Sequence, residues 1–338
     1  MPTDSGSPHD RRRTTPTRLV ASGRGRVAGI VGLVLLTLVA AGCSTSSTLR
    51  TQSAGTRHPG IPASSAPSIV KAPVRVAHTD DGDVSYRSLG RGPAVVLIMG
   101  YSGSMDQWQP AFVDQLARTY HVVIFDNSGI GQTSLPPGTM TMSSMADQTA
   151  ALISALHLDR PAVLGWSMGG MIAQALAVLH PHDVGHLVLA ATLPGNGHAT
   201  LPTASAAAIL ANPSASNVSA LLGLLFPANH AADGPAYLKA MELYPDFYLA
   251  PPSVDAAQLQ AITSWAAGQD PAGSGIGRLH MPVLVADGAQ DALIPSSNDR
   301  ELAHVIPHAQ LLLYPDASHA FLFQDEASFV PRLERFFG

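Results

Sequence analysis

The sequence predicts an α/β fold with a mainly parallel sheet, and three observations support this prediction. Short apolar runs alternate with segments of helical periodicity from residue 94 onward. The runs are apolar at consecutive positions, so helices are expected to cover both faces of each strand, as is typical of parallel sheets. A stretch of roughly 80 residues without a clear strand then interrupts the alternation, which indicates an insertion between two strands.

Local sequence patterns predict the individual strands and helices of this fold. Two short alternating segments flank a turn at residues 80–83, which predicts an N-terminal antiparallel hairpin. The residues from about 197 to 277 have helical spacing, which favours a helical cap inserted between two strands. Strands are expected at 94–99, 121–125, 162–164, 186–190, 282–286 and 310–314, and helices near 106–118, 143–157, 168–180, 297–305 and 325–337.

The N-terminus predicts export. Six arginines precede the uncharged run 27–40, which is shorter than the ~20 residues of a membrane-spanning helix, so residues 1–42 are interpreted as a lipoprotein signal peptide. Val39-Ala-Ala-Gly-Cys43 resembles the bacterial lipoprotein signal, although Ala40 replaces the usual leucine. We expect lipid at Cys43, the only cysteine, and anchoring to the outer face of the cell membrane. The alternative is a plain signal peptide, or an uncleaved anchor, with an incidental cysteine.

Composition separates a tether from a folded domain. Eleven of the 27 residues from 44 to 70 are Ser or Thr, so residues 43–70 are expected to form a flexible tether. Residues 71–338 are expected to form the folded domain. From residue 43 onward, 13 basic residues stand against 22 acidic ones, a formal net charge of −9. This balance disfavours a nucleic-acid partner, and nothing in the composition fixes the oligomeric state.

The segment Gly165-Trp-Ser-Met-Gly-Gly170 contains a candidate nucleophile. Ser167 follows the expected strand 162–164 and precedes an expected helix. A serine at such a strand-to-helix turn needs very small residues two positions before and after it, here Gly165 and Gly169. An ordinary glycine-rich turn with an incidental serine is the alternative. The strand–turn–helix context favours Ser167 as a nucleophile.

A nucleophilic serine needs a histidine base, and that histidine needs an acid that fixes its tautomer. Asp291 and His319 each follow the end of an expected strand, and the carboxyl ends of strands are where open α/β sheets place their sites. Asp287 and Asp316 are the alternatives to Asp291. Asp287 lies close to the strand end, and Asp316 precedes the histidine by only three residues. The thirteen other histidines lack the position of His319.

The strand spacing, the GxSMGG turn, the helical insertion and the chain order Ser167, Asp291, His319 resemble the α/β-hydrolase superfamily over roughly residues 72–338. The motifs are similar to its branch of esterases, lipases and cofactor-free haloperoxidases. The resemblance implies an α/β-hydrolase fold and a serine hydrolase that cleaves a small-molecule ester, or a related acyl substrate, through an acyl-enzyme.

The resemblance also implies an oxyanion hole made by the backbone N–H groups of Met168 and of Tyr101, in the loop after the third strand. No cofactor and no metal ion is expected, because neither a phosphate loop nor metal-ligand spacing occurs. Two positions depart from the family pattern. Met99 stands where many relatives have histidine, and Ser128 stands at the usual arginine. Asp126, in the same turn as Ser128, is interpreted as a structural turn residue.

Several functions stay open at this point. The same three residues serve haloperoxidase, thioesterase, amidase or peptidase chemistry in enzymes of this kind. A cell-surface binding lipoprotein with little turnover belongs to a different class. A serine at this turn argues against the epoxide-hydrolase and dehalogenase relatives, which use aspartate there. The apolar cap residues form either the core of the cap or an acyl pocket. Neither the acyl chain length nor the alcohol is specified.

Overall fold

The computed structural model describes residues 67–210 and 217–338. The predicted signal peptide, the candidate lipidation site Cys43 and the tether up to residue 66 lie outside these ranges. Within them the chain forms an eight-stranded sheet with the order β1-β2-β4-β3-β5-β6-β7-β8. In these two ranges no helix combines the length and the apolar character needed to cross a membrane.

The sheet is mainly parallel. β1 pairs with β2 and β2 with β4 in antiparallel register, whereas all other neighbouring strands are parallel. The predicted parallel sheet with an N-terminal antiparallel hairpin is therefore confirmed. The strands are β1 (Arg75–Thr79), β2 (Gly82–Leu89), β3 (Ala94–Ile98), β4 (His121–Phe125), β5 (Ala162–Trp166), β6 (His186–Ala190), β7 (Val283–Gly288) and β8 (Gln310–Tyr314).

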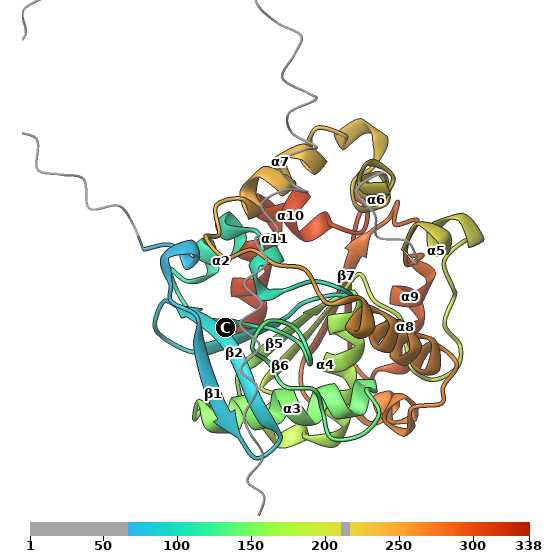
Figure 1. Ribbon diagram of the computed structural model, residues 1–338. Coiled ribbons are helices and arrows are strands. Elements are labelled where there is room, and N and C mark those ends of the chain that lie inside the picture. The colour runs from blue at the N-terminus through green and yellow to red at the C-terminus, as the bar shows by residue number, and fades with distance from the viewer. Residues whose placement is uncertain (1–66, 211–216) are drawn as a thin grey trace, which may run out of the picture. The chain divides into compact units, whose positions relative to one another are not determined.

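Helices cover the sheet on both sides (Figure 1). α3 packs against α4, and α2 packs against α11, and the two pairs lie on opposite faces of the sheet. In the described part of the chain, the helices outside the insertion are α2 (Pro110–Leu116), α3 (Met142–Ala155), α4 (Met168–Leu179), α9 (Ser297–Val305), α10 (Phe321–Gln324) and α11 (Glu326–Phe337). Short 3-10 turns are η1 (Ile69–Lys71), η2 (Met105–Gln107) and η3 (Pro181–Asp183).

The helical insertion expected from the sequence lies between β6 and β7. In the part of this stretch that the structure describes, no strand occurs. We call this insertion the cap. It contains α5 (Ala204–Leu210), α6 (Val218–Leu225), η5 (Ala228–His230), α7 (Asp233–Met241), α8 (Pro252–Ala266) and η6 (Pro271–Arg278).

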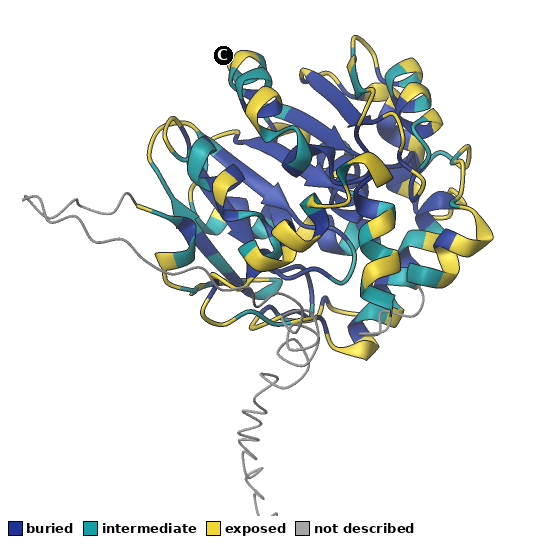
Figure 2. Ribbon diagram, turned by 90° about the horizontal axis from the view of Figure 1, so that it is seen from above, coloured by how far each residue is buried: buried dark blue, intermediate teal, exposed yellow. Residues whose placement is uncertain are grey.

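The central strands form the core. Figure 2 shows them almost wholly buried, whereas the helices expose one face to solvent. The side chains of Val95 to Ile98 in β3 and of Val122 to Ile124 in β4 are fully buried on both faces of the sheet. Each buried side chain of this size contributes roughly 1.5–3 kcal/mol to folding. Because both faces of these strands are buried, apolar residues occur at consecutive positions in the sequence.

The folded domain begins slightly earlier than residue 71, the boundary expected from composition. Ile69 is fully buried, and its backbone N–H donates to Asp114 Oδ1 at 2.7 Å. Residues 69–71 thus pack against α2, with Ile69 as the buried side chain of this turn. The Ser and Thr content of residues 44–70 is an average over 27 residues, so it does not indicate that Ile69 is buried.

Candidate active site

Ser167 occupies a strained turn at the end of β5. Its backbone has φ 59° and ψ −122°, and residues other than glycine rarely adopt a positive φ. The end of β6 holds both backbone polar groups of Ser167, because Ser167 N–H donates to Ala190 O at 2.9 Å and Thr192 Oγ1 donates to Ser167 O at 2.7 Å. Ser167 is partly exposed, whereas Trp166 and Met168 beside it are buried.

The glycines around Ser167 allow close backbone approach. A Cβ at Gly165 would lie 2.1 Å from Gly169 O, and a Cβ at Gly169 would lie 2.1 Å from Ile98 O. A Cβ at Gly170 would lie 2.6 Å from the Thr192 side chain. The first two contacts involve backbone atoms, which have little freedom to move, so α4 can approach β5 and β3 this closely only with glycine at these positions.

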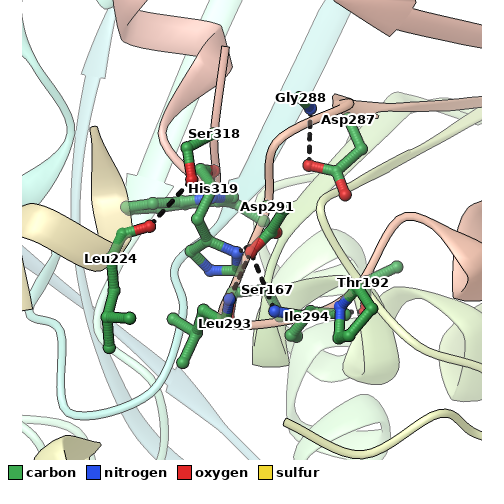
Figure 3. Close-up of polar contacts among 12 residues, drawn as sticks. Ser167, Thr192, Leu224, Asp287, Gly288, Asp291, Leu293, Ile294, Ser318 and His319 are labelled. Carbon is green, nitrogen blue, oxygen red and sulfur yellow. Dashed lines mark hydrogen bonds and ion pairs between the residues drawn. The ribbon is translucent and has the colours of Figure 1, made fainter. Parts of the chain in front are cut away.

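His319 and Asp291 form a buried pair. His319 Nδ1 lies 2.6 Å from Asp291 Oδ2, with side chains 2% and 0% exposed. Asp291 Oδ1 accepts the backbone N–H groups of Leu293 at 2.7 Å and Ile294 at 2.8 Å (Figure 3). One carboxylate oxygen thus faces the ring, and the other is fixed by the loop that follows β7.

The carboxylate accepts hydrogen bonds only, so in the neutral ring the proton belongs on Nδ1 and the lone pair on Nε2. The loop carrying His319 is tied to β5, because Trp166 Nε1 donates to His319 O at 2.9 Å and the two rings lie 5.6 Å apart. Ser167 directly follows Trp166 in the chain. In the described residues, no hydrogen bond joins Ser167 Oγ to His319 Nε2. Hydrogen bonds between a nucleophile and its base are often long in substrate-free enzymes.

The alternatives to Asp291 do not reach the histidine ring. Asp316 is exposed. Asp287 Oδ1 accepts the N–H of Gly288 at 2.7 Å, and its carboxyl lies next to that of Asp299 on α9. Burial raises the pKa of both Asp287 and Asp299 well above the ordinary value, and the neighbouring carboxylates add to the rise for Asp287. Asp291 is the carboxylate that contacts His319.

The loop after β3 runs past the serine. A Cβ at Gly100 would lie 3.1 Å from Ser167 Cβ and 3.7 Å from Ser167 Oγ, so the loop backbone lies against the candidate nucleophile. Asn127 Nδ2 donates to Met99 O at 2.8 Å and holds the start of this loop. Tyr101 follows Gly100 directly. Met168 is the first residue of α4, where backbone N–H groups have no partner within the helix.

Asp126 has the contacts of a structural residue. It is fully buried and accepts hydrogen bonds from Ser85 Oγ at 2.7 Å, from Met105 N–H at 2.8 Å and from the Tyr248 hydroxyl. Burial raises its pKa, and these donors act in the opposite direction. Ser128, which departs from the arginine expected from the family pattern, donates to Gln148 Oε1 at 2.7 Å. The turn is thus held by short polar contacts.

Sequence reasoning missed two residues around this site. Trp166 lies inside the GxSMGG segment, but nothing in that motif indicates a contact between its indole and the His319 loop. Gln258 on α8 accepts the backbone N–H of Ser102 at 2.8 Å across 156 residues of sequence. No local pattern signals such a contact. Within the residues that the structure describes, no group of three or more His, Cys, Asp or Glu side chains could hold a metal ion.

Two curated proteins are similar to this chain over more than two thirds of its length. RutD from Caulobacter sp. (strain K31), a candidate carbamate hydrolase, is 30% identical over 252 residues, 71% of this chain and 90% of that protein. BpoC from Mycobacterium tuberculosis, a candidate non-heme bromoperoxidase, is 31% identical over 265 residues, 76% and 98% of the two chains. The solved structure of an alpha/beta hydrolase fold protein from Chitinophaga pinensis superimposes with a TM-score of 0.67 at 26% identity, over 80% of this chain and 98% of that chain.

Residues 93–326 match the family described as alpha/beta hydrolase fold. This match, the two curated relatives and the sheet topology agree with one another, and together they cover most of the described chain. The chain is an enzyme of the α/β-hydrolase fold family.

Proposed function

We propose that this chain is a serine hydrolase that cleaves a carboxylic ester, or a related acyl substrate, through an acyl-enzyme intermediate. The observation that carries the proposal is the buried pair of His319 and Asp291, 2.6 Å apart. Its loop contacts Trp166, the residue directly before the strained and partly exposed Ser167. A nucleophile, a base and an orienting acid are the parts that acyl transfer needs.

Each residue has one role in the proposed reaction. Ser167 Oγ attacks the acyl carbon while His319 Nε2 takes its proton, and Asp291 holds the ring in the required tautomer. The tetrahedral intermediate expels the alcohol, which receives the proton from Nε2. Water then gives a proton to Nε2 and attacks the acyl-enzyme, and the acid leaves as Ser167 regains its proton. No cofactor takes part.

The oxyanion of both tetrahedral intermediates is assigned to two backbone donors. Met168 N–H lies at the amino end of α4, where the helix dipole favours negative charge. Tyr101 N–H lies in the loop that passes Ser167 at Gly100. Donors fixed in advance in this way supply a large part of the rate in acyl transfer.

The substrate class is inferred from the chemistry of the site and from the relatives. The name of RutD refers to carbamate hydrolysis, and a carbamate carbonyl reacts with a serine in the same way as an ester carbonyl. The name of BpoC supports a second candidate function, in which hydrogen peroxide replaces water and the acyl-enzyme yields a peroxyacid. Competition between the two is measured by following ester turnover with and without added peroxide.

We also propose that the enzyme is exported and held at the outer face of the membrane through lipid on Cys43. The arginine-rich start, the short apolar run and the single cysteine support this. Mass spectrometry of the N-terminal peptide tests it. A lipid-modified Cys43 as the first residue is the expected result, and an unmodified Cys43 within an intact chain would reject the proposal.

A panel of p-nitrophenyl esters of graded acyl length tests the activity. The parent is expected to hydrolyse at least the shorter esters, and Ser167→Ala is expected to reduce kcat by roughly 10⁵-fold or more. Ser253→Ala, at an exposed serine of α8, is the matched control and should keep the parent rate. If the folded parent turned over none of the esters, a cell-surface binding protein would be the better account.

A further inference from the structure

The cap reaches into the loop that carries the proposed oxyanion donor Tyr101. Gln258, in the middle of α8, has a fully buried side chain, and its Oε1 accepts the backbone N–H of Ser102 at 2.8 Å. Ser102 has φ 61°, in the left-handed region that is unfavourable for a serine. A hydrogen bond to the backbone at this residue stabilises a conformation that the chain would not adopt unaided.

This contact lies one residue from Tyr101. Gly100 passes against Ser167, Tyr101 follows it, and the peptide group between Tyr101 and Ser102 is the one that Gln258 holds. At the other end of the loop, Asn127 Nδ2 holds Met99 O at 2.8 Å. The loop is therefore clamped at two points, from the body of the enzyme by Asn127 and from the cap by Gln258.

Packing alone does not account for a glutamine at this position. Among the residues that the structure describes, Gln258 Nε2 is buried without a hydrogen-bond partner. A buried polar group without a partner costs about 1–3 kcal/mol, which a methionine of similar size would avoid. Asp255 lies one turn earlier on α8, and burial raises the pKa of its carboxyl while the Ser102 hydroxyl acts in the opposite direction. Two polar side chains of α8 thus face the same loop.

We propose that Gln258 is a positioning residue for the oxyanion hole. By accepting the Ser102 N–H, it fixes the orientation of the Tyr101 backbone. Full turnover then depends on the contact between the cap and this loop. This inference rests on the proposed serine hydrolase function. Gln258 stabilises the transition state only through the loop, so its loss should lower kcat and leave substrate affinity nearly unchanged.

The first test compares Gln258→Met with Gln260→Met. Gln260 lies on the same helix but is exposed, so its variant controls for the substitution itself. Gln258→Met is expected to lower kcat for a p-nitrophenyl ester about 10- to 100-fold, with KM changed less than about twofold. This decrease in kcat should not exceed the decrease caused by removing an oxyanion donor itself. An unchanged kcat, or a change confined to KM, would overturn the inference while the parent remained active.

The second test does not depend on turnover. Hydrogen exchange of the Ser102 amide in the parent should be protected, and exchange should be faster by tenfold or more in Gln258→Met but not in Gln260→Met. An unprotected Ser102 amide in the parent overturns the inference even where Gln258→Met does not fold. If the parent and Gln260→Met both hydrolysed none of the esters, the proposed hydrolase function would be rejected, and the positioning role with it.

Discussion

At the scale of single residues, the site depends on groups that are fixed before a substrate arrives. Asp291 uses one oxygen for His319 and the other for two backbone N–H groups, so its carboxylate cannot turn without breaking three hydrogen bonds. The ring of His319 is further held by the Trp166 contact with its loop. Such preorganisation fixes the His319 ring before a substrate binds, as its proposed role as the base for Ser167 requires.

Asp291→Asn tests the assigned orienting role. An asparagine amide at the same place favours the wrong tautomer of His319, so kcat for ester hydrolysis should fall by about 10³–10⁴-fold, less than in Ser167→Ala. Steady-state kinetics with a p-nitrophenyl ester measure this. Asp316→Asn, at an exposed carboxylate three residues before His319, is the control and should behave as the parent. Equal losses in both variants would remove the distinction between the two carboxylates.

Asp287 and Asp299 should make the stability of the fold depend on pH. Both have pKa values raised by burial, so the folded state keeps protons that the unfolded state releases. The free energy of unfolding should therefore fall as pH rises above about 4. Asp299→Asn should raise it by on the order of 1 kcal/mol at neutral pH and flatten this fall, because an amide can donate to Asp287.

Urea unfolding of Asp299→Asn at a series of pH values checks this prediction. Asp316→Asn should leave the pH profile unchanged, because its carboxylate is exposed. A parent whose stability rises steadily from pH 4 to pH 8 would contradict the raised pKa values in the folded state.

At the scale of elements, the strand–turn–helix unit at Ser167 requires glycine for steric reasons. Gly165→Ala should destabilise the enzyme by about 1–3 kcal/mol or more, because the new Cβ would lie 2.1 Å from Gly169 O. Gly223→Ala, at an exposed helical glycine with nothing within 4 Å, is the control and should raise stability by up to about 1 kcal/mol. Thermal unfolding distinguishes the two; a Gly165→Ala variant as stable as the parent would contradict the close approach.

The cap contacts the body of the enzyme at both sides of the proposed site. On α6, Leu224 O accepts from Ser318 Oγ at 2.9 Å and Leu225 O accepts from Ala320 N–H at 2.9 Å, so the neighbours of His319 are both held. On α8, Gln258 holds Ser102. The cap therefore contacts both the loop of the candidate base and the loop of the candidate oxyanion donor.

Elements that are defined by local pattern could be predicted from the sequence. The strands 121–125, 186–190 and 310–314 and the helix 297–305 have the expected bounds, because continuous apolar runs and helical periodicity are local properties. The expected helix 106–118 is shorter, because a 3-10 turn at Met105–Gln107 precedes it and Pro110 starts the α-helix. The closing helix, expected at 325–337, spans Glu326–Phe337 and is preceded by a separate short helix, Phe321–Gln324; Asp325 caps both.

The candidate site was predictable only in part. Ser167, Asp291 and His319 carry local signals, namely glycines and positions after strand ends, and the structure brings Asp291 and His319 into contact. The contacts of Trp166 and Gln258 depend on residues 153 and 156 positions away in the chain. Such contacts are set by the way the cap and the loops fold back onto the sheet, which periodicity does not encode.

At the scale of the whole molecule, the buried side chain of Ile69 lies at the start of the described domain. A chain that begins at Pro67 should fold and turn over esters at the rate of a chain that begins at Ser44. A chain that begins at Ala72 lacks Ile69, whose burial contributes roughly 1.5–3 kcal/mol, and should be less stable by about that amount. Urea unfolding of the three chains measures this. Equal stability of the Pro67 and Ala72 chains would show that Ile69 contributes nothing.

The central claim is that Ser167 is a nucleophile activated by His319. A fluorophosphonate probe reacts with a serine that has an activated hydroxyl, and mass spectrometry of the labelled peptide identifies the residue. We predict labelling of the parent at Ser167, lost in Ser167→Ala and in His319→Ala, with all three proteins folded by circular dichroism. A folded parent that stays unlabelled and hydrolyses no ester would contradict the account.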